Sequence, residues 1–145
     1  MREILFRGKR CDNGEWVQGF YVRADHHWHK NGIHKDWIIC GASANGGWFA
    51  LHNKYAVKAE TVGQFTGLTD KNGKKIFEGD IIGYHAQGDI IVNFGVVCWD
   101  EEDARWAYQL NTMKPGFYMH NPNTVEVIGN IHDNPKLLEG GVEDG

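Results

Sequence analysis

Four histidines lie close together in the first quarter of the chain, and they are His26, His27, His29 and His34. On an extended strand His27 and His29 share one face, and a reversal at Asn31 and Gly32 brings His34 back toward them. Three converging imidazole rings suit Zn²⁺ or Ni²⁺. We treat His27, His29 and His34 as candidate metal ligands, although we favour the simpler interpretation of an exposed, histidine-rich loop.

Two groups of carboxylates have the composition for cation or proton chemistry. Residues 100–103 are four consecutive acids, whose oxygens suit hard cations, but the run lacks the alternation and the glycine of a calcium loop. Glu78 and Asp80 flank Gly79, and paired carboxylates can divide acid and base roles. We interpret the first group as a solvated turn and the second as part of a structural corner.

Aromatic residues make up 12% of the chain, and six of them are tryptophans. On a β surface such side chains stack on bases or contact a protein partner. Most of them should lie in the core, but Trp28 falls within the polar segment 24–36 and is expected to be exposed. We therefore predict a protein interface that includes Trp28 and Tyr21.

Arrangements for nucleophilic catalysis are absent from the sequence. Ser43 is the only serine, and no G-x-S-x-G motif surrounds it. Cys40 lies in a predicted apolar strand, where a thiol is usually inert. The glycine-rich run 41–47 ends in no lysine and opens no helix, which argues against a phosphate-binding loop. We predict that the protein is not an enzyme and carries no cofactor, unless the histidines bind zinc or nickel.

Charge and composition restrict the classes of partner. The chain has 145 residues, a formal net charge of −4 and a pI of about 6.0. This acidic balance argues against nucleic acid, whose ligands usually carry a basic excess. No apolar run approaches the roughly 20 residues that span a bilayer, and the first residues lack the apolar core of a signal peptide. Three widely spaced cysteines indicate free thiols, so we expect the cytoplasm.

Turn signals recur along the chain, and no long segment shows helical periodicity. These turn signals, at 12–15, 70–73 and 87–89 among others, separate short apolar runs. The longest apolar run is residues 90–99, which we treat as a candidate central strand. We expect short strands at 37–40 and 48–51 with a flexible segment at 41–47 between them. The predicted fold is all-β, with an N-terminal β-hairpin region, a barrel-like C-terminal lobe and at most short helical turns.

The expected organisation is a single domain over residues 1–145, or two lobes at 1–55 and 56–139. A flexible tail is expected at 140–145, because termini that are not anchored are poorly ordered. Asp133 to Pro135 has the pattern of a helix start, and the residues after it allow one turn of helix.

Three stretches together resemble the YopX family of phage and prophage proteins. The central stretch is residues 60–82, ETVGQFTGLTDKNGKKIFEGDII, and the flanking ones are REILFRG at 2–8 and GNIHDNPKLL at 129–138. The matches span the chain, while residues 24–58 and 100–120 follow no family pattern. The resemblance implies a phage or prophage origin, a bacterial host cell and a mostly β, barrel-like fold. The family is known mainly as uncharacterised, so the resemblance implies no activity and no catalytic residues.

The central stretch also has a physical explanation in terms of turns. Asn72 and Gly73 allow a tight reversal, Gly67 and Gly79 permit positive φ, and Asp70 and Asp80 can accept backbone N–H bonds. We therefore interpret the set as structural, and it comprises Gly67, Asp70, Asn72, Gly73, Glu78, Gly79 and Asp80.

The leading functional hypothesis is a non-enzymatic protein-interaction or self-assembling β module. It would bind another protein, or itself as a homo-oligomer, through its N-terminal strands and the segment rich in histidine and tryptophan. The alternative is a nucleic-acid-binding β barrel, which the acidic charge disfavours. The second alternative is a metal-binding protein that uses the histidine segment.

Overall fold

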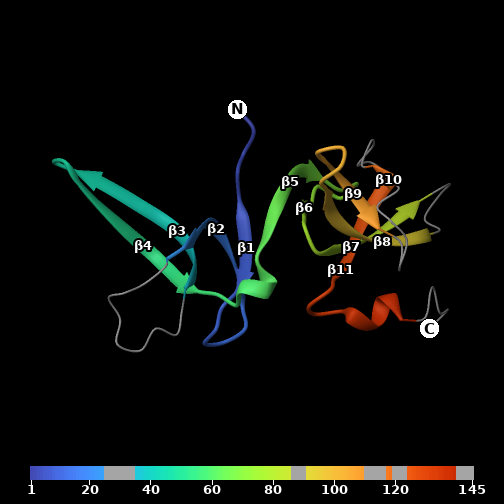
Figure 1. Ribbon diagram of the computed structural model, residues 1–145, viewed down its shortest axis with the longest axis horizontal. Coiled ribbons are helices and arrows are strands. Elements are labelled where there is room, and N and C mark those ends of the chain that lie inside the picture. The colour runs from blue at the N-terminus through green and yellow to red at the C-terminus, as the bar shows by residue number, and fades with distance from the viewer. Residues whose placement is uncertain (25–34, 86–90, 110–116, 119–123, 140–145) are drawn as a thin grey trace. The chain divides into compact units, whose positions relative to one another are not determined.

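The regular structure of the protein is almost entirely extended strand (Figure 1). The computed structural model describes residues 1–24, 35–85, 91–109, 117–118 and 124–139. These ranges contain strands β1 to β11 and two short 3₁₀ helices, η1 (Ala59–Thr61) and η3 (Pro135–Leu138). The prediction of an all-β fold with at most short helical turns is therefore confirmed. Within the described ranges, neither helical segment has the length and apolar character that crossing a membrane requires.

The chain divides into two compact units, Met1–Gln64 and Phe65–Gly145. The first is an antiparallel sheet in the order β4-β3-β2-β1. Its strands are β1 (Phe6–Lys9), β2 (Trp16–Arg23), β3 (Asp36–Asn45) and β4 (Trp48–Ala56). The start of β5 (Gly63–Thr69) pairs with β1, where Phe6 lies opposite Gln64. Strand β4 ends this order, so it is the sheet edge among the described strands.

A two-residue turn joins β3 to β4 and sets their register. Gly46 and Gly47 have φ of +58° and +86°, and the pair that closes the turn is Asn45 opposite Trp48. A loop with two positive φ values matches the twist of the flanking strands and suits glycine at both positions. Residues 41–45 were expected to be a flexible segment, but they belong to β3. Backbone pairing with β4 extends the strand despite small residues with low β propensity.

The core of the first unit lies at the base of the β3–β4 hairpin, close to β1. Ile38, Ile39 and Val57 are buried there. The rings of Phe6 and Tyr21 pack with centroids 5.7 Å apart. The buried apolar side chains therefore lie close to β1. None of those described belongs to the far part of β3 and β4.

The second unit contains a β hairpin and a five-stranded antiparallel sheet in the order β10-β9-β8-β7-β11. The hairpin joins the end of β5 to β6 (Lys75–Phe77). The sheet strands are β7 (Asp80–His85), β8 (Ile91–Asp100), β9 (Arg105–Gln109), β10 (Phe117–Tyr118) and β11 (Val125–Asn130). Strand β8 is the middle strand, as the apolar run at 90–99 predicts.

The predicted barrel is wrong, because the five-stranded sheet is open. Strands β10 and β11 lie at opposite edges, and no pairing joins them among the described residues. Closure needs edge strands long enough to form a ladder at the required stagger, and β10 has two residues. Ile82, Val97, Val125 and Val127 of this sheet form one buried cluster with Ile76 of β6.

Candidate interaction surface

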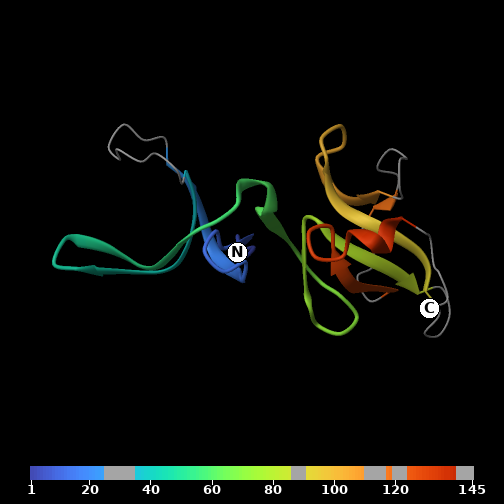
Figure 2. The same cartoon turned by 90° about the horizontal axis from the view of Figure 1, so that it is seen from below.

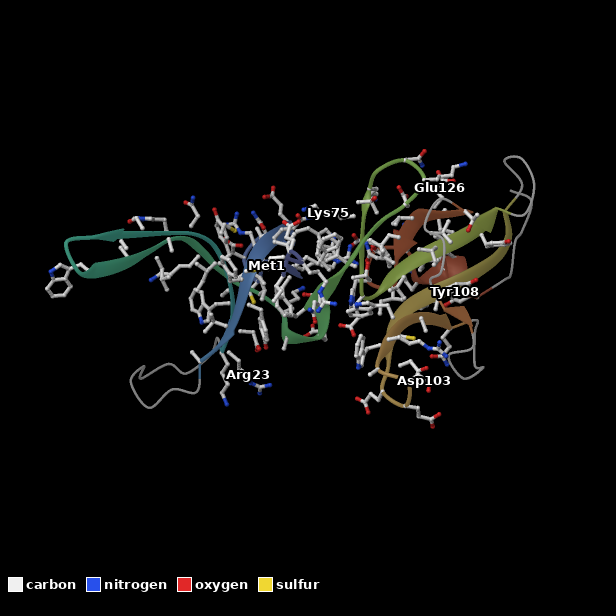
Figure 3. The ribbon with its side chains drawn as sticks, turned by 90° about the horizontal axis from the view of Figure 1, so that it is seen from above. Met1, Arg23, Lys75, Asp103, Tyr108 and Glu126 are labelled. Atoms are coloured by element: carbon white, nitrogen blue, oxygen red, sulfur yellow. The ribbon has the colours of Figure 1, made fainter. Side chains whose placement is uncertain are left out.

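The far part of the β3–β4 hairpin, residues Gly41 to Lys54, extends away from β1 and β2, and we call it the arm (Figure 2). Every side chain that the structure describes between Ala42 and Lys54 is exposed. The exposed fraction is 83% for Trp48 and 40% for Leu51. Both faces of the arm therefore meet solvent, and Figure 3 shows its side chains apart from the crowded base of the unit. A two-stranded hairpin with no covered face is marginally stable in water.

One face of the arm is continuous with the face of β2 that carries two exposed apolar side chains. Phe20 lies opposite Ile39, and Val22 lies opposite Trp37. Directly paired residues share a face, and alternate residues along a strand share it too, so this face also carries Trp48. Phe20 is 64% exposed. Polar side chains such as His52 and Lys54 lie on this face between its two ends, so its exposed apolar side chains are Phe20 and Val22 on β2 and Trp48 at the tip, while Leu51 lies on the opposite face.

A hydrogen bond between Ser43 and His52 crosses the arm. Ser43 Oγ lies 2.6 Å from His52 Nε2, a distance also found between a catalytic serine and its base. Both side chains are exposed, and no carboxylate contacts His52 among the described residues. A nucleophile needs an oriented base and a site that excludes water. We therefore interpret this bond as a link between the two strands of the arm.

Tyr21, a predicted interface residue, lies at the base of the sheet and is half-buried. Its hydroxyl donates a hydrogen bond to the carboxylate of Asp36. That bond, and burial after it, raise the pKa of Tyr21 above its ordinary value. The other predicted interface residue, Trp28, lies outside the described residues. The candidate metal ligands His27, His29 and His34 also lie outside them.

Asp70 lies at the predicted turn in the central stretch 60–82, and its carboxylate accepts three backbone N–H groups. Oδ1 accepts from Asn72 and Lys74 at 2.9 Å each, and Oδ2 accepts from Val127 at 2.9 Å. Gly73, with φ of +79°, donates its N–H to the Asp70 carbonyl at 3.0 Å. Asp70 is 4% exposed. The carboxylate thus shapes its own turn and attaches that turn to β11.

The corner at 78–80 is also built from backbone contacts. The Asp80 side chain is 1% exposed, and its Oδ2 accepts the N–H of Phe77 at 2.8 Å. The N–H of Gly79, where φ is +88°, donates to the Val97 carbonyl at 2.9 Å. Glu78 is half-buried beside it, and Gly67 has φ of +89°. A carboxylate buried against its own turn is poorly placed to exchange protons with a substrate.

The acidic run at 100–103 forms the turn between β8 and β9, and Figure 3 labels Asp103 there. Asp100 is buried and its Oδ1 accepts the N–H of Glu102 at 3.1 Å, while Asp103 pairs with Arg105 at 2.9 Å. Among the residues that the structure describes, no group of three histidine, cysteine or acidic side chains is placed to hold a metal ion.

An open pocket lies at the base of the arm, lined by Arg10, Cys11, Asp12, Lys54, Tyr55 and Ala56. The Arg10 guanidinium pairs with Asp12 at 2.6 Å and lies 4.3 Å from the centre of the Tyr55 ring. Its charge is thus already balanced at the surface, which leaves little attraction for an anionic ligand. The three cysteines of the chain are free, and burial raises the pKa of each thiol. Fewer thiolates form at neutral pH as a result.

The arm was not predicted from the sequence, although a signal for it was present. From Trp37 to Asn53 the chain contains no Asp, Glu, Lys or Arg, while such residues make up 23% of the whole. Edge strands are usually protected by charged side chains, especially lysine. A long uncharged hairpin that contains the sheet edge is therefore a sign of an interaction surface.

Comparison with known proteins gives a family and a fold. A family described as YopX protein matches residues 5–139. The crystal structure of protein EF1440 from Enterococcus faecalis is similar with a TM-score of 0.61 and 22% sequence identity, over 95% of this chain and 99% of that one. No curated protein matches the chain.

Proposed function

This chain belongs to the YopX family, and we propose that it is a non-enzymatic module that binds protein through the arm. The observation that carries the proposal is the exposure of the arm on both faces together with the absence of Asp, Glu, Lys and Arg from it up to Asn53. Exposed apolar side chains such as Trp48 and Leu51 on an uncharged hairpin mark a contact site. A phage or prophage origin and a place in the bacterial cytoplasm are part of the proposal, and the three free thiols support a reducing compartment.

Trp48 is the expected centre of the contact. Tryptophan is among the residues that contribute most to binding when a partner covers them, and its alanine substitution often costs about 2 kcal/mol or more. The indole is 83% exposed at the end of the arm, so a partner has nearly all of its surface to cover. Phe20 and Val22 extend the same face toward the base and widen the available contact.

The polar groups of the chain support a binding function over catalysis. The carboxylates of Asp70 and Asp80 are buried and accept backbone N–H groups. The only serine bonds a histidine on an open surface. Nucleic acid is the weaker alternative, because the arm up to Asn53 offers no cation to neutralise phosphates.

An affinity experiment tests the proposal with two matched variants. Tagged wild type, Trp48→Ser and Ile4→Ser are mixed with untagged copies of the chain and with bacterial extract, and retained proteins are quantified. Ile4 is also exposed, at 56%, but lies outside the arm, so it is the control. We expect Trp48→Ser to weaken retention of a stoichiometric partner about 30-fold and Ile4→Ser to leave it unchanged. Equal retention by all three proteins, or by none, would contradict the proposal.

A further inference from the structure

We propose that the partner of the arm is a second copy of this chain, joined edge to edge along β4. The inference rests on the proposed function and names the partner for the same surface. It is argued from two observations, that no described strand pairs with the outer edge of β4 and that residues 37–53 carry no charge, and from the symmetry that antiparallel pairing would impose.

Among the described strands, none pairs with the outer edge of β4 over residues 48–52. Asn45 and Trp48 close a two-residue turn, so this pair exchanges both of its N–H···O bonds. Alternate residues after Trp48 then direct their backbone groups toward β3, and the residues between them, including Leu51, direct theirs outward. At Asn53, φ is +51°, which ends the regular stretch. The outward N–H and C=O groups of this stretch are a template for another strand.

The lack of charge favours a copy of the same strand. A different partner is generally selected through complementary charges, and the arm presents none up to Asn53. For a strand that pairs antiparallel with itself, a charge near the two-fold axis would come close to its own copy and repel it. A segment free of Asp, Glu, Lys and Arg avoids this cost entirely.

Symmetry makes such an assembly finite. Two β4 strands that pair antiparallel are related by a two-fold axis, so each edge is used up in a single contact. The result joins two sheets through their β4 edges and protects an uncharged edge from indefinite growth. Leu51 lies one residue from the middle of the stretch 48–52. The two copies of Leu51 therefore come close together, on diagonal or directly opposed positions.

A charge-swap experiment at Leu51 tests the pairing. Sedimentation equilibrium of the wild type is expected to give twice the chain mass of 16.4 kDa. Leu51→Lys alone and Leu51→Glu alone place like charges near the two-fold axis, and each should weaken the dimer at least about tenfold. An equimolar mixture of the two variants should recover most of the wild-type affinity, because opposite charges then meet. Asn13→Lys and Asn13→Glu change an exposed turn between β1 and β2 and should have no effect.

Hydrogen exchange measured on the wild type tests the pairing without relying on the folding of any variant. Amides of residues 48–52 should become more protected as protein concentration rises, while amides of the turn at 12–15 should not change. A wild type that stays monomeric at about 100 μM, or a mixture no tighter than the single variants, overturns the inference. If the chain is monomeric but Trp48→Ser still loses another captured protein, self-pairing is wrong and the proposed function stands.

Discussion

The tip of the arm and the turn at 70–74 are both tight reversals between strands, yet different interactions stabilise them. At residues 70–74 a buried carboxylate binds three backbone N–H groups, one of them from a distant strand. At residues 45–48 the glycines alone make the turn, and all the side chains described around it are exposed. The first arrangement fixes the fold of its unit, and the second presents strands to solvent. Side-chain chemistry at a turn thus separates a structural role from a contact role.

The largest expected effect is at Asp70. Asp70→Ala leaves three backbone donors without their acceptor in a buried site, and it should lower the free energy of unfolding by about 4 kcal/mol. Asp70→Asn keeps one acceptor oxygen and should lose about half as much. Urea unfolding followed by tryptophan fluorescence measures both. Ser43→Ala in the arm is the control and should change stability by less than about 0.5 kcal/mol, since its hydrogen bond is exposed. An Asp70→Ala loss no larger than the Ser43→Ala loss would remove the distinction between the two turns.

A second test removes similar aliphatic side chains from the two regions. Ile82 is buried in the cluster of the second unit, and Ile82→Ala should cost about 3 kcal/mol of unfolding free energy. Leu51 is exposed in the arm, and Leu51→Ala should cost less than about 0.5 kcal/mol. Urea unfolding of both variants should be done at low protein concentration, because dimer formation adds stability through mass action. Similar losses at the two sites in dilute solution would mean that the arm contributes to a core after all.

The sequence predicted the parts of the fold that depend on local chemistry. The reversal at Asn72 and Gly73, and the local acceptor role of Asp70, follow from residue types within a few positions. The bond from Val127 to Asp70 joins positions 57 residues apart, and no local pattern indicates it. The open sheet has the same explanation, because closure depends on distant edges such as the two-residue β10.

The candidate surface was harder to predict than the fold, because it depends on which side chains stay exposed after folding. Gly41, Ala42 and Ala44 have low β propensity, so the sequence suggested a flexible segment where the structure has a strand. Pairing with β4 overrides that preference. The exposure of Trp48 could not be read from its type, since most tryptophans are expected in cores. The absence of charged residues between Trp37 and Asn53 indicates the surface. The net charge of the whole chain does not reveal this local absence.

The smallest effect is expected at two tyrosines, on the unfolding free energy at alkaline pH. The hydrogen bond to Asp36 and then burial raise the pKa of Tyr21, while burial and then the Coulombic effect of Tyr84 raise that of Tyr108. A pKa raised by folding means that the folded state favours the neutral phenol. Each tyrosine therefore contributes stability that is complete below the unfolded pKa of about 10 and is lost as pH rises through the folded pKa.

Tyr21→Phe and Tyr108→Phe should each flatten the fall in unfolding free energy between about pH 9 and pH 11. Urea unfolding at each pH measures the slopes, and the difference from wild type isolates each tyrosine from the cysteines, whose raised pKa values act in the same direction. At neutral pH Tyr21→Phe should also lose some stability, because the Asp36 carboxylate loses its donor. Slopes equal to wild type in both variants would show that neither phenol is held neutral by the fold. An unchanged slope for Tyr21→Phe alone would mean that its bond to Asp36 does not persist in solution.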